Sequence, residues 1–485
     1  MQVAQLLSSS ATALARAIRE RRVTSRAIVD AHIARIERVN PSLRAMVRDR
    51  FADARREADV ADARVADSHS DDLPPLFGVP VTVKEAIACA GMPNTSGLWS
   101  RRDRRGRRDA SAVRRLKEAG AIVLGVTNVS ELCMWMESSN KVWGRTNNAH
   151  DPTRTAGGSS GGEGALVGAG GSPLGLGSDV GGSIRMPAFF NGVFGHKPTG
   201  GLVPSTGHHP PATNELQRYV TTGPIARRAE DLLPALRIVA GPDGVEQRCI
   251  PSCLPPEGTA TPLRGRPVFV VRSNGLFDVE GPMLAALERA ARALEAAGAR
   301  VEERKVPSLV RAIEIWSAML HDGGEVTFRE LLAAGADEFA PLRELARMPF
   351  GRSNYTFPAV MLCFVELLPR VLPARARKMA ALGHELRREL EGLIGDEGVL
   401  LHPSYPTVAP KHHHALFVPF KWIFTGIFNV LEMPVTQVPL GLDGRGVPLG
   451  VQVAGANGKD HVTIAVAEEL ERRLGGWVPP SRWPL

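Results

Sequence analysis

Cysteine is scarce in this sequence, and long hydrophobic runs are missing from it. Only 5 of the 485 residues are cysteine, an odd number scattered along the chain. Such a set does not form a disulfide framework, and it fits a reducing compartment. Cys249 and Cys253 are close together, but no second pair of ligands at zinc spacing accompanies them. Because no run of about 18 apolar residues occurs, a membrane-spanning helix is not expected.

Aromatic residues are also few, at 5% of the chain, whereas the net charge is +8. The surplus is mostly arginine, and Arg101–Arg108 is the one dense basic run. No aromatic residues alternate with this run to stack on bases, so we interpret it as a solvated loop and expect no nucleic-acid partner.

Met1–Arg22 lacks the early basic segment and long apolar stretch of a secretory signal, which predicts a cytoplasmic location.

Strand and helix patterns alternate along much of the chain and predict an α/β fold with a substantial central sheet. Residues 308–395 have a less regular helical pattern, and we interpret them as an inserted helical cap. Since no linker divides the chain, we predict one domain, with N-terminal helices over 1–72, a catalytic core over 73–307 and the rest of that core over 396–485. Buried strands are predicted over 76–83, 121–126, 267–272, 399–405, 433–439 and 449–453, and helices over 11–67, 112–119, 229–239, 283–297 and 461–474.

The stretch from Gly157 to Pro198 is rich in glycine and carries two clusters with serine, GGSSGG at 157–162 and GGS at 181–183. Glycine costs conformational entropy, so it is used where backbone must bend sharply or bring N–H groups to a ligand. Serine is a weak nucleophile until a base takes its proton, and histidine is the usual base. The stretch contains only His196, in what reads as a Gly-His-Lys-Pro turn.

Lys84 offers another base, since it directly follows the apolar strand pattern that ends at Val83. Burial would lower the pKa of its amine toward neutrality, so that it could take a proton through an intervening hydroxyl. Taken alone, a lysine in this place is usually a solvated strand end. The nucleophile-elbow pattern Gly-x-Ser-x-Gly occurs around Ser159 and Ser160, but residues 150–156 do not read as the strand that an elbow requires.

Three motifs together resemble the amidase signature family: Phe77–Glu85 (FGVPVTVKE), the two Gly-Ser clusters, and Gly195–Thr199 (GHKPT). The resemblance implies a large mixed central sheet covered by helices on both faces, and a Ser–cis-Ser–Lys triad. By motif, Lys84 resembles the base, Ser159 the bridging serine on a cis peptide and Ser183 the nucleophile that becomes acylated.

The resemblance also implies supporting roles around the triad. Asp179 and Arg185 are expected to pair and hold the nucleophile loop, with ordinary loop charges as the alternative. Ser160 is expected to donate a hydrogen bond within the triad network, or else to bond locally in the turn. The backbone of Cys133 is expected to contact the substrate. The oxyanion hole is expected from the backbone N–H groups of Val180, Gly181, Gly182 and Ser183.

Within the family, Gly161–Leu166, Arg185–Gly192 and Pro406–His413 resemble the fatty-acid amide hydrolase branch, in particular its second mammalian type. A pocket for an acyl group should be apolar. Residues 132–136 lie where the family places its substrate-lining residues. Further candidates, which could equally be core, are Tyr355, Phe357, Val360, Met361, Phe364, Leu367, Leu368, Phe417, Phe420, Trp422, Ile423, Phe424 and Phe428.

We therefore predict a serine amidohydrolase without a cofactor, which cleaves a small-molecule amide with an apolar, fatty-acid-like acyl part through an acyl-enzyme on Ser183. An aryl-acylamidase, a small-amide amidase and an amidotransferase subunit with partner chains are the alternatives. No metal is expected at His412–His414, because adjacent side chains point in different directions. The basic segment Arg370–Lys378 beside the apolar cap leaves peripheral membrane contact open, and the resemblance leaves a homodimer open.

Overall fold

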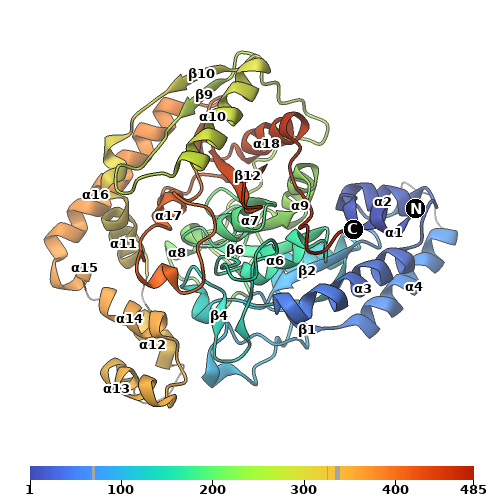
Figure 1. Ribbon diagram of the computed structural model, residues 1–485, viewed down its shortest axis with the longest axis horizontal. Helices are drawn as coiled ribbons and strands as arrows, with labels where there is room; N and C mark the ends of the chain where they lie inside the picture. The colour runs from blue at the N-terminus through green and yellow to red at the C-terminus, as the bar shows by residue number, and fades with distance from the viewer. Residues whose placement is uncertain (68–71, 325, 334–338, 367) are drawn as a thin grey trace.

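A mixed sheet forms the centre of the fold, as the resemblance implies. The computed structural model describes residues 1–67, 72–324, 326–333, 339–366 and 368–485. Within them an 11-stranded sheet has the order β1-β3-β2-β6-β8-β7-β12-β13-β11-β9-β10 (Figure 1). β2 pairs in parallel with β3 and β6, and β9 with β10 and β11, while the other pairs are antiparallel.

The strands of this sheet are β1 (Met46–Asp49), β2 (Pro80–Lys84), β3 (Ile122–Thr127), β6 (Leu174–Asp179), β7 (Phe194–Lys197), β8 (Thr221–Ala226), β9 (Pro267–Val270), β10 (Arg300–Glu303), β11 (Val399–Pro403), β12 (Val435–Leu442) and β13 (Pro448–Ala454). A small hairpin pairs β4 (Ser139–Asn140) with β5 (Gly144–Arg145). Strands from the first part of the chain and from its last part therefore share one sheet.

The helices are α1 (Val3–Ser8), α2 (Ala11–Arg19), α3 (Ser25–Leu43), α4 (Phe51–Asp67), α5 (Ser111–Glu118), α6 (Gly161–Gly168), α7 (Arg185–Phe190), α8 (Leu216–Tyr219), α9 (Leu232–Val239), α10 (Gly281–Ala296), α11 (Ala312–Asp322), α12 (Phe328–Ala333), α13 (Pro341–Arg347), α14 (Phe357–Val365), α15 (Leu368–Val371), α16 (Pro373–Ile394), α17 (Ile423–Val430) and α18 (Asp460–Leu474). α5, α9, α18 and α10 pack against one another in that order, and α3, α6 and α7 form a second row.

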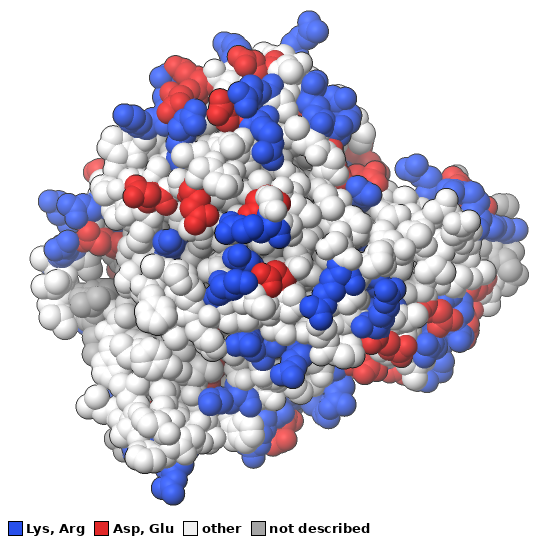
Figure 2. All heavy atoms as spheres, viewed as in Figure 1, with Lys and Arg blue, Asp and Glu red and all other residues white. Residues whose placement is uncertain are grey.

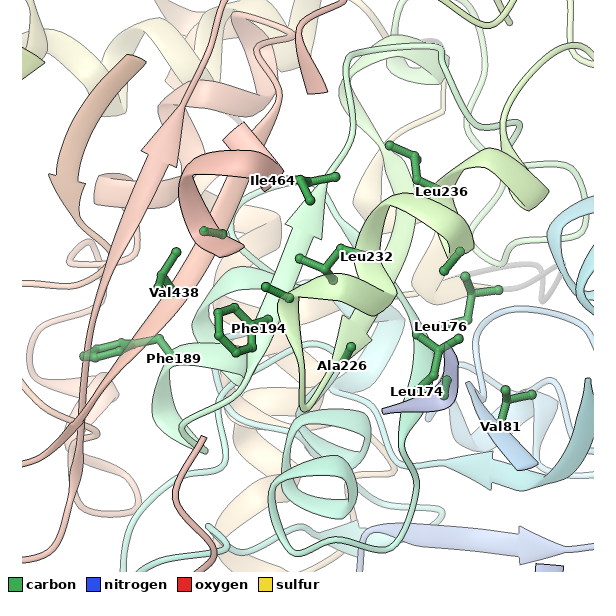
Figure 3. Close-up of a cluster of buried hydrophobic side chains, with 14 of the residues drawn as sticks. Val81, Leu174, Leu176, Phe189, Phe194, Ala226, Leu232, Leu236, Val438 and Ile464 are labelled. Atoms are coloured by element: carbon green, nitrogen blue, oxygen red, sulfur yellow. The ribbon is translucent and has the colours of Figure 1, made fainter. Parts of the chain in front are cut away.

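The two rows of helices lie on opposite faces of the sheet. Figure 3 shows Leu174 and Leu176 of β6 in one buried cluster with Leu232 and Leu236 of α9. Successive side chains of a strand point to opposite faces. Gly175 accordingly faces α6, where a Cβ atom would collide with the carboxylate of Glu163. Only glycine at this position allows α6, which follows the first Gly-Ser cluster, to lie so close to the sheet.

Most of the predicted strands are confirmed, but three local predictions are wrong. The span 11–67 is not helical throughout, because β1 within it pairs with β3 at the edge of the sheet. The first predicted strand begins at Pro80 rather than Leu76, because the residues before it turn and bond to the α5–β3 connection through Leu76 N–H to the Ala119 carbonyl (2.9 Å). His196 lies in β7 and not in a turn. Its backbone is extended because β7 pairs with both β8 and β12.

The segment predicted as a cap consists mainly of helices in its described residues, and these helices divide into two groups. α11 and α16 pack on each other, and α16 also contacts β9, so they extend the layer over the sheet. α12 and α14 instead form a separate apolar cluster around Leu132, with Phe339, Val360 and Cys363. The second group thereby covers the loop that follows β3.

Charge is mixed over the visible face, where basic and acidic side chains alternate (Figure 2). The same view shows a largely uncharged area over α12–α14. No helix in the described ranges is both long enough and apolar enough to cross a membrane.

Candidate active site

Lys84 and Ser159 are in direct contact at the C-terminal end of β2. Lys84 is the last residue of β2 and is fully buried, and its Nζ atom lies 2.6 Å from Ser159 Oγ. Burial lowers the pKa of Lys84, although Cys133 and Asp179 oppose the shift. The solvated-strand-end interpretation is therefore excluded, and burial favours the neutral amine, which is the form that can act as a base.

The first Gly-Ser cluster is shaped by backbone contacts. The Gly158–Ser159 peptide bond is cis, as the resemblance implies. Ser138 Oγ donates a hydrogen bond to the Ser159 carbonyl (3.0 Å) and accepts one from the Gly161 N–H (2.8 Å). These contacts hold the turn that places Ser159 Oγ between Lys84 and the cavity.

Ser160 connects the two clusters but does not join the triad hydroxyls. Its hydroxyl donates to the Ser178 carbonyl at 3.2 Å, and its backbone N–H donates to the Ser183 carbonyl, also at 3.2 Å. Ser183 therefore lies beside Ser159, and both line the same cavity. Within the described residues no hydrogen bond holds the Ser183 hydroxyl, so it is free to rotate toward Ser159.

Asp179 and Arg185 form a fully buried ion pair, as expected. The guanidinium donates to both carboxylate oxygens, through Nε to Oδ2 and through Nη2 to Oδ1, each at 3.0 Å. Burial alone would raise the pKa of Asp179, but Arg185 and the Ile184 N–H outweigh it and hold the pKa below its usual range. The same carboxylate accepts the N–H groups of Gly182 (2.6 Å) and Ile184 (3.0 Å). The pair thus organises the loop that carries Ser183.

The expected oxyanion donors are not equivalent. The Gly182 N–H points to Asp179, so it is not available to a substrate oxygen in this structure, and the expectation for Gly182 needs correcting. Val180 and Gly181 line the larger cavity with Ser183, and their carbonyls are engaged by Trp316 Nε1 (3.0 Å) and Thr425 Oγ1 (2.9 Å). With φ of 115° and Thr425 against its Cα, position 182 requires glycine.

A family model described as Amidase matches residues 27–464. The chain belongs to the amidase signature family. It is accordingly an amide hydrolase. Fatty-acid amide hydrolase 2-A of Danio rerio is 44% identical over 98% of this chain and 91% of that protein. Fatty-acid amide hydrolase 2 of Homo sapiens is 43% identical over 99% of this chain and 91% of that human protein. A solved 6-aminohexanoate cyclic dimer hydrolase has a TM-score of 0.81 at 25% identity, covering 99% of this chain and 100% of that one.

Two cavities in this amidase meet at Ser183. The larger has a volume of about 700 Å³, and the smaller about 200 Å³. Cys133, which the resemblance implies as a substrate contact, lines both cavities, and so does Trp316. The larger cavity is lined mainly by apolar side chains, including Met134, Trp135, Met136, Phe357, Met361, Leu372, Phe420 and Trp422.

The candidate lining residues divide between the cavity and the core. Val360, Ile423, Phe424 and Phe428 are buried core, Tyr355 donates to the Leu332 carbonyl (3.2 Å), and Phe364 packs against the α12–α14 cluster. Phe417 is 82% exposed and lines neither cavity. Leu367 and the side chain of Leu368 lie outside the described residues.

Two polar residues of the amidase site were missed by sequence reasoning. Ser178 Oγ lies 2.9 Å from Lys84 Nζ, and His208 Nε2 lies 2.8 Å from Ser178 Oγ. Ser178 directly precedes Asp179, so its proximity to the nucleophile loop could have drawn attention to it. His208 comes from a distant loop, and no sequence pattern marks it.

Proposed function

We propose that this amidase hydrolyses carboxylic amides with an apolar, fatty-acid-like acyl part, through an acyl-enzyme on Ser183. One observation carries the proposal: the buried Lys84–Ser159 contact ends beside Ser183, at the wall of an apolar cavity of about 700 Å³. A cavity of this size and lining suits a long acyl chain. The names of the two fatty-acid amide hydrolases similar to it support the same substrate class.

In the proposed mechanism, neutral Lys84 accepts the Ser159 proton while Ser159 accepts that of Ser183. The Ser183 oxygen attacks the amide carbon, the C–N bond breaks, and the relay returns the proton to the leaving amine. Water then attacks the carbonyl carbon of the Ser183 ester while the relay accepts a proton from it. The bond from that carbon to Ser183 Oγ breaks, the relay returns the proton to Oγ, and the acid leaves as a carboxylate. A hydrogen bond between the Ser183 hydroxyl and Ser159 Oγ is expected to form when substrate is bound, as catalytic hydrogen bonds often align only in the complex.

The N–H groups of Val180, Gly181 and Ser183 are the proposed donors to the developing oxyanion. Each such donor contributes roughly 3 kcal/mol to the transition state. The Gly182 N–H acts differently in this proposal, because its bond to Asp179 holds the loop in place. The backbone of Cys133 is proposed to contact the substrate where the two cavities meet.

The test is hydrolysis of a series of acyl anilides by the wild type and by Ser183→Ala. We expect a rate that rises with acyl length until the larger cavity is filled, and no turnover by the variant. A fluorophosphonate should label wild-type Ser183 and leave Ser183→Ala unlabelled. Turnover by Ser183→Ala, or labelling at another residue, would refute the proposed nucleophile.

The same series separates the alternatives. Preference for short or aromatic acyl groups would favour a small-amide amidase or an aryl-acylamidase. Glutaminase activity that depends on a co-purified chain would favour an amidotransferase subunit.

We also propose that the mouth of the larger cavity contacts a lipid surface. Phe357, Leu372 and Phe420 line the cavity yet remain 48%, 50% and 39% exposed. Arg375 beside them is paired with Glu314 (2.6 Å), whereas Arg377 and Lys378, next on α16, are exposed basic residues. Apolar groups beside basic ones bind anionic membranes. Leu372→Glu should reduce co-sedimentation with phosphatidylglycerol vesicles, whereas Leu342→Glu, on the exposed α13, should not. Equal binding of both variants to the vesicles would contradict the proposed membrane contact. Whether the protein is a homodimer is tested separately by light scattering.

A further inference from the structure

His208 lies in the loop after β7, close to the catalytic lysine but outside the expected triad. The loop is held against the segment after β2 by Ala88 N–H to the Gly207 carbonyl (3.0 Å) and by His209 N–H to the Ala86 carbonyl (2.9 Å). His208 is buried, and its Nδ1 lies 2.9 Å from the Pro210 carbonyl oxygen. A carbonyl can only accept, so Nδ1 carries the hydrogen.

The other ring nitrogen, Nε2, is therefore an acceptor when the ring is neutral. Burial, with a smaller contribution from Lys84, lowers the pKa of His208 to about 4, while its hydrogen bond to Pro210 opposes the shift. The ring is thus neutral around pH 7. Ser178 Oγ lies 2.8 Å from Nε2, so the Ser178 hydroxyl must donate to it. This uses the only hydrogen of that hydroxyl.

With its hydrogen directed to His208, Ser178 Oγ can only accept from Lys84 Nζ, 2.9 Å away. A neutral amine has two hydrogens and one lone pair. One hydrogen goes to Ser178 Oγ, and the other faces the Ser178 carbonyl at 3.4 Å. The lone pair is left for Ser159 Oγ at 2.6 Å, which is the direction that proton transfer requires.

We propose that His208 is a positioning residue, which acts through the Ser178 hydroxyl to direct the Lys84 lone pair toward Ser159. Without an acceptor at Nε2, the Ser178 hydroxyl can rotate and donate to Lys84. It then competes with Ser159 for the same lone pair. His208 exchanges no proton in this role, so the number of protons moved per turnover is unchanged. The inference rests on the proposed function, in which Lys84 is the base.

The experiment compares kcat and KM for His208→Leu, Ser178→Ala and the double variant on one acyl anilide. We expect each single variant to lower kcat roughly tenfold to a hundredfold with little change in KM, since only proton transfer is affected. The double variant should lose no more than the worse single one, because both changes break the same connection. His208→Gln, whose amide oxygen can accept from Ser178, should restore most of kcat.

Ser172→Ala is the matched control. Ser172 is a buried serine just before β6, whose hydroxyl donates to the Leu174 carbonyl at 2.7 Å, far along the strand from Lys84. The Ser172→Ala variant should therefore have the kcat of the wild type. Wild-type kcat in His208→Leu, or losses that multiply in the double variant, would overturn the inference. If His208→Leu does not fold, unchanged kcat in Ser178→Ala would also overturn it. Turnover by Ser183→Ala would instead refute the proposed function.

Discussion

Replacing Asp179 with asparagine tests whether the buried ion pair holds the nucleophile loop. Neither side chain of the Asp179–Arg185 pair has any exposed surface. In Asp179→Asn the Arg185 guanidinium stays buried without its counter-charge, which costs about 3–5 kcal/mol of the free energy of unfolding. The Asp179 carboxylate accepts hydrogen bonds from the N–H groups of both Gly182 and Ile184. In the variant, the side-chain NH2 group replaces one of the two accepting oxygens and faces one of these N–H donors. A displaced loop should lower kcat about 100-fold.

The assay is urea unfolding followed by tryptophan fluorescence, together with turnover of an acyl anilide. The matched control is Glu288→Gln, which removes an exposed partner of Arg292 on α10 (3.1 Å) and should change stability by less than about 1 kcal/mol. A loss below about 1 kcal/mol in Asp179→Asn, with kcat retained, would refute the reasoning.

The same pair predicts a dependence of stability on pH. The pKa of Asp179 is lower in the folded chain than the ordinary value of about 3.9, so in acid the unfolded chain binds more protons. The stabilisation is therefore present above about pH 4 and is lost as the pH falls through the lowered folded pKa. The wild type should lose stability in acid more steeply than Asp179→Asn. Parallel curves would contradict the assignment.

Three further changes test the site. Because burial lowers the pKa of Lys84, kcat/KM should rise with pH and level off below about 10.4, the pKa of free lysine. Lys84→Met should lose about 100-fold or more of the rate, and its rate should no longer rise with pH in this range. An unchanged pH profile in the variant would exclude Lys84 as the base. Gly182→Ala should lower both melting temperature and kcat, because its Cβ would collide with Thr425 at a φ of 115°, and wild-type values would contradict the contact. Ala376→Phe, in the wall of the larger cavity, should shift the preference of kcat/KM toward shorter acyl chains, and an unshifted preference would exclude this cavity as the acyl site.

Local sequence patterns were sufficient for six of the 11 strands of the sheet, and the family motifs pointed to the groups that we propose as the reacting ones. Val81 to Val83 form a buried strand because β-branched side chains suit a sheet, and Lys84 ends that strand as predicted. The glycines around Ser159 and Ser183 showed where backbone must pack closely. These patterns depend only on residues that are close in sequence, so they can be recognised without knowledge of the fold.

Burial and hydrogen-bond partners depend instead on residues that are distant in sequence, and the tertiary structure alone decided them. The Gly182 N–H was expected to face the substrate, but the Asp179 carboxylate, fixed by Arg185, takes it. The predicted cap became two groups of helices, because α11 and α16 could pack on α17 and the edge of the sheet.

The sequence by itself, through its motifs, determined which groups we propose to react in this amidase: a lysine after a strand and two serines in glycine-rich turns. The structure decided which hydrogen-bond partners surround the amine. Lys84 contacts Ser159 at a sequence separation of 75 residues, and the loop after β7 adds His208 on the other side of Ser178. A hydrogen-bond direction depends on every acceptor within reach, and only the folded chain brings those acceptors together.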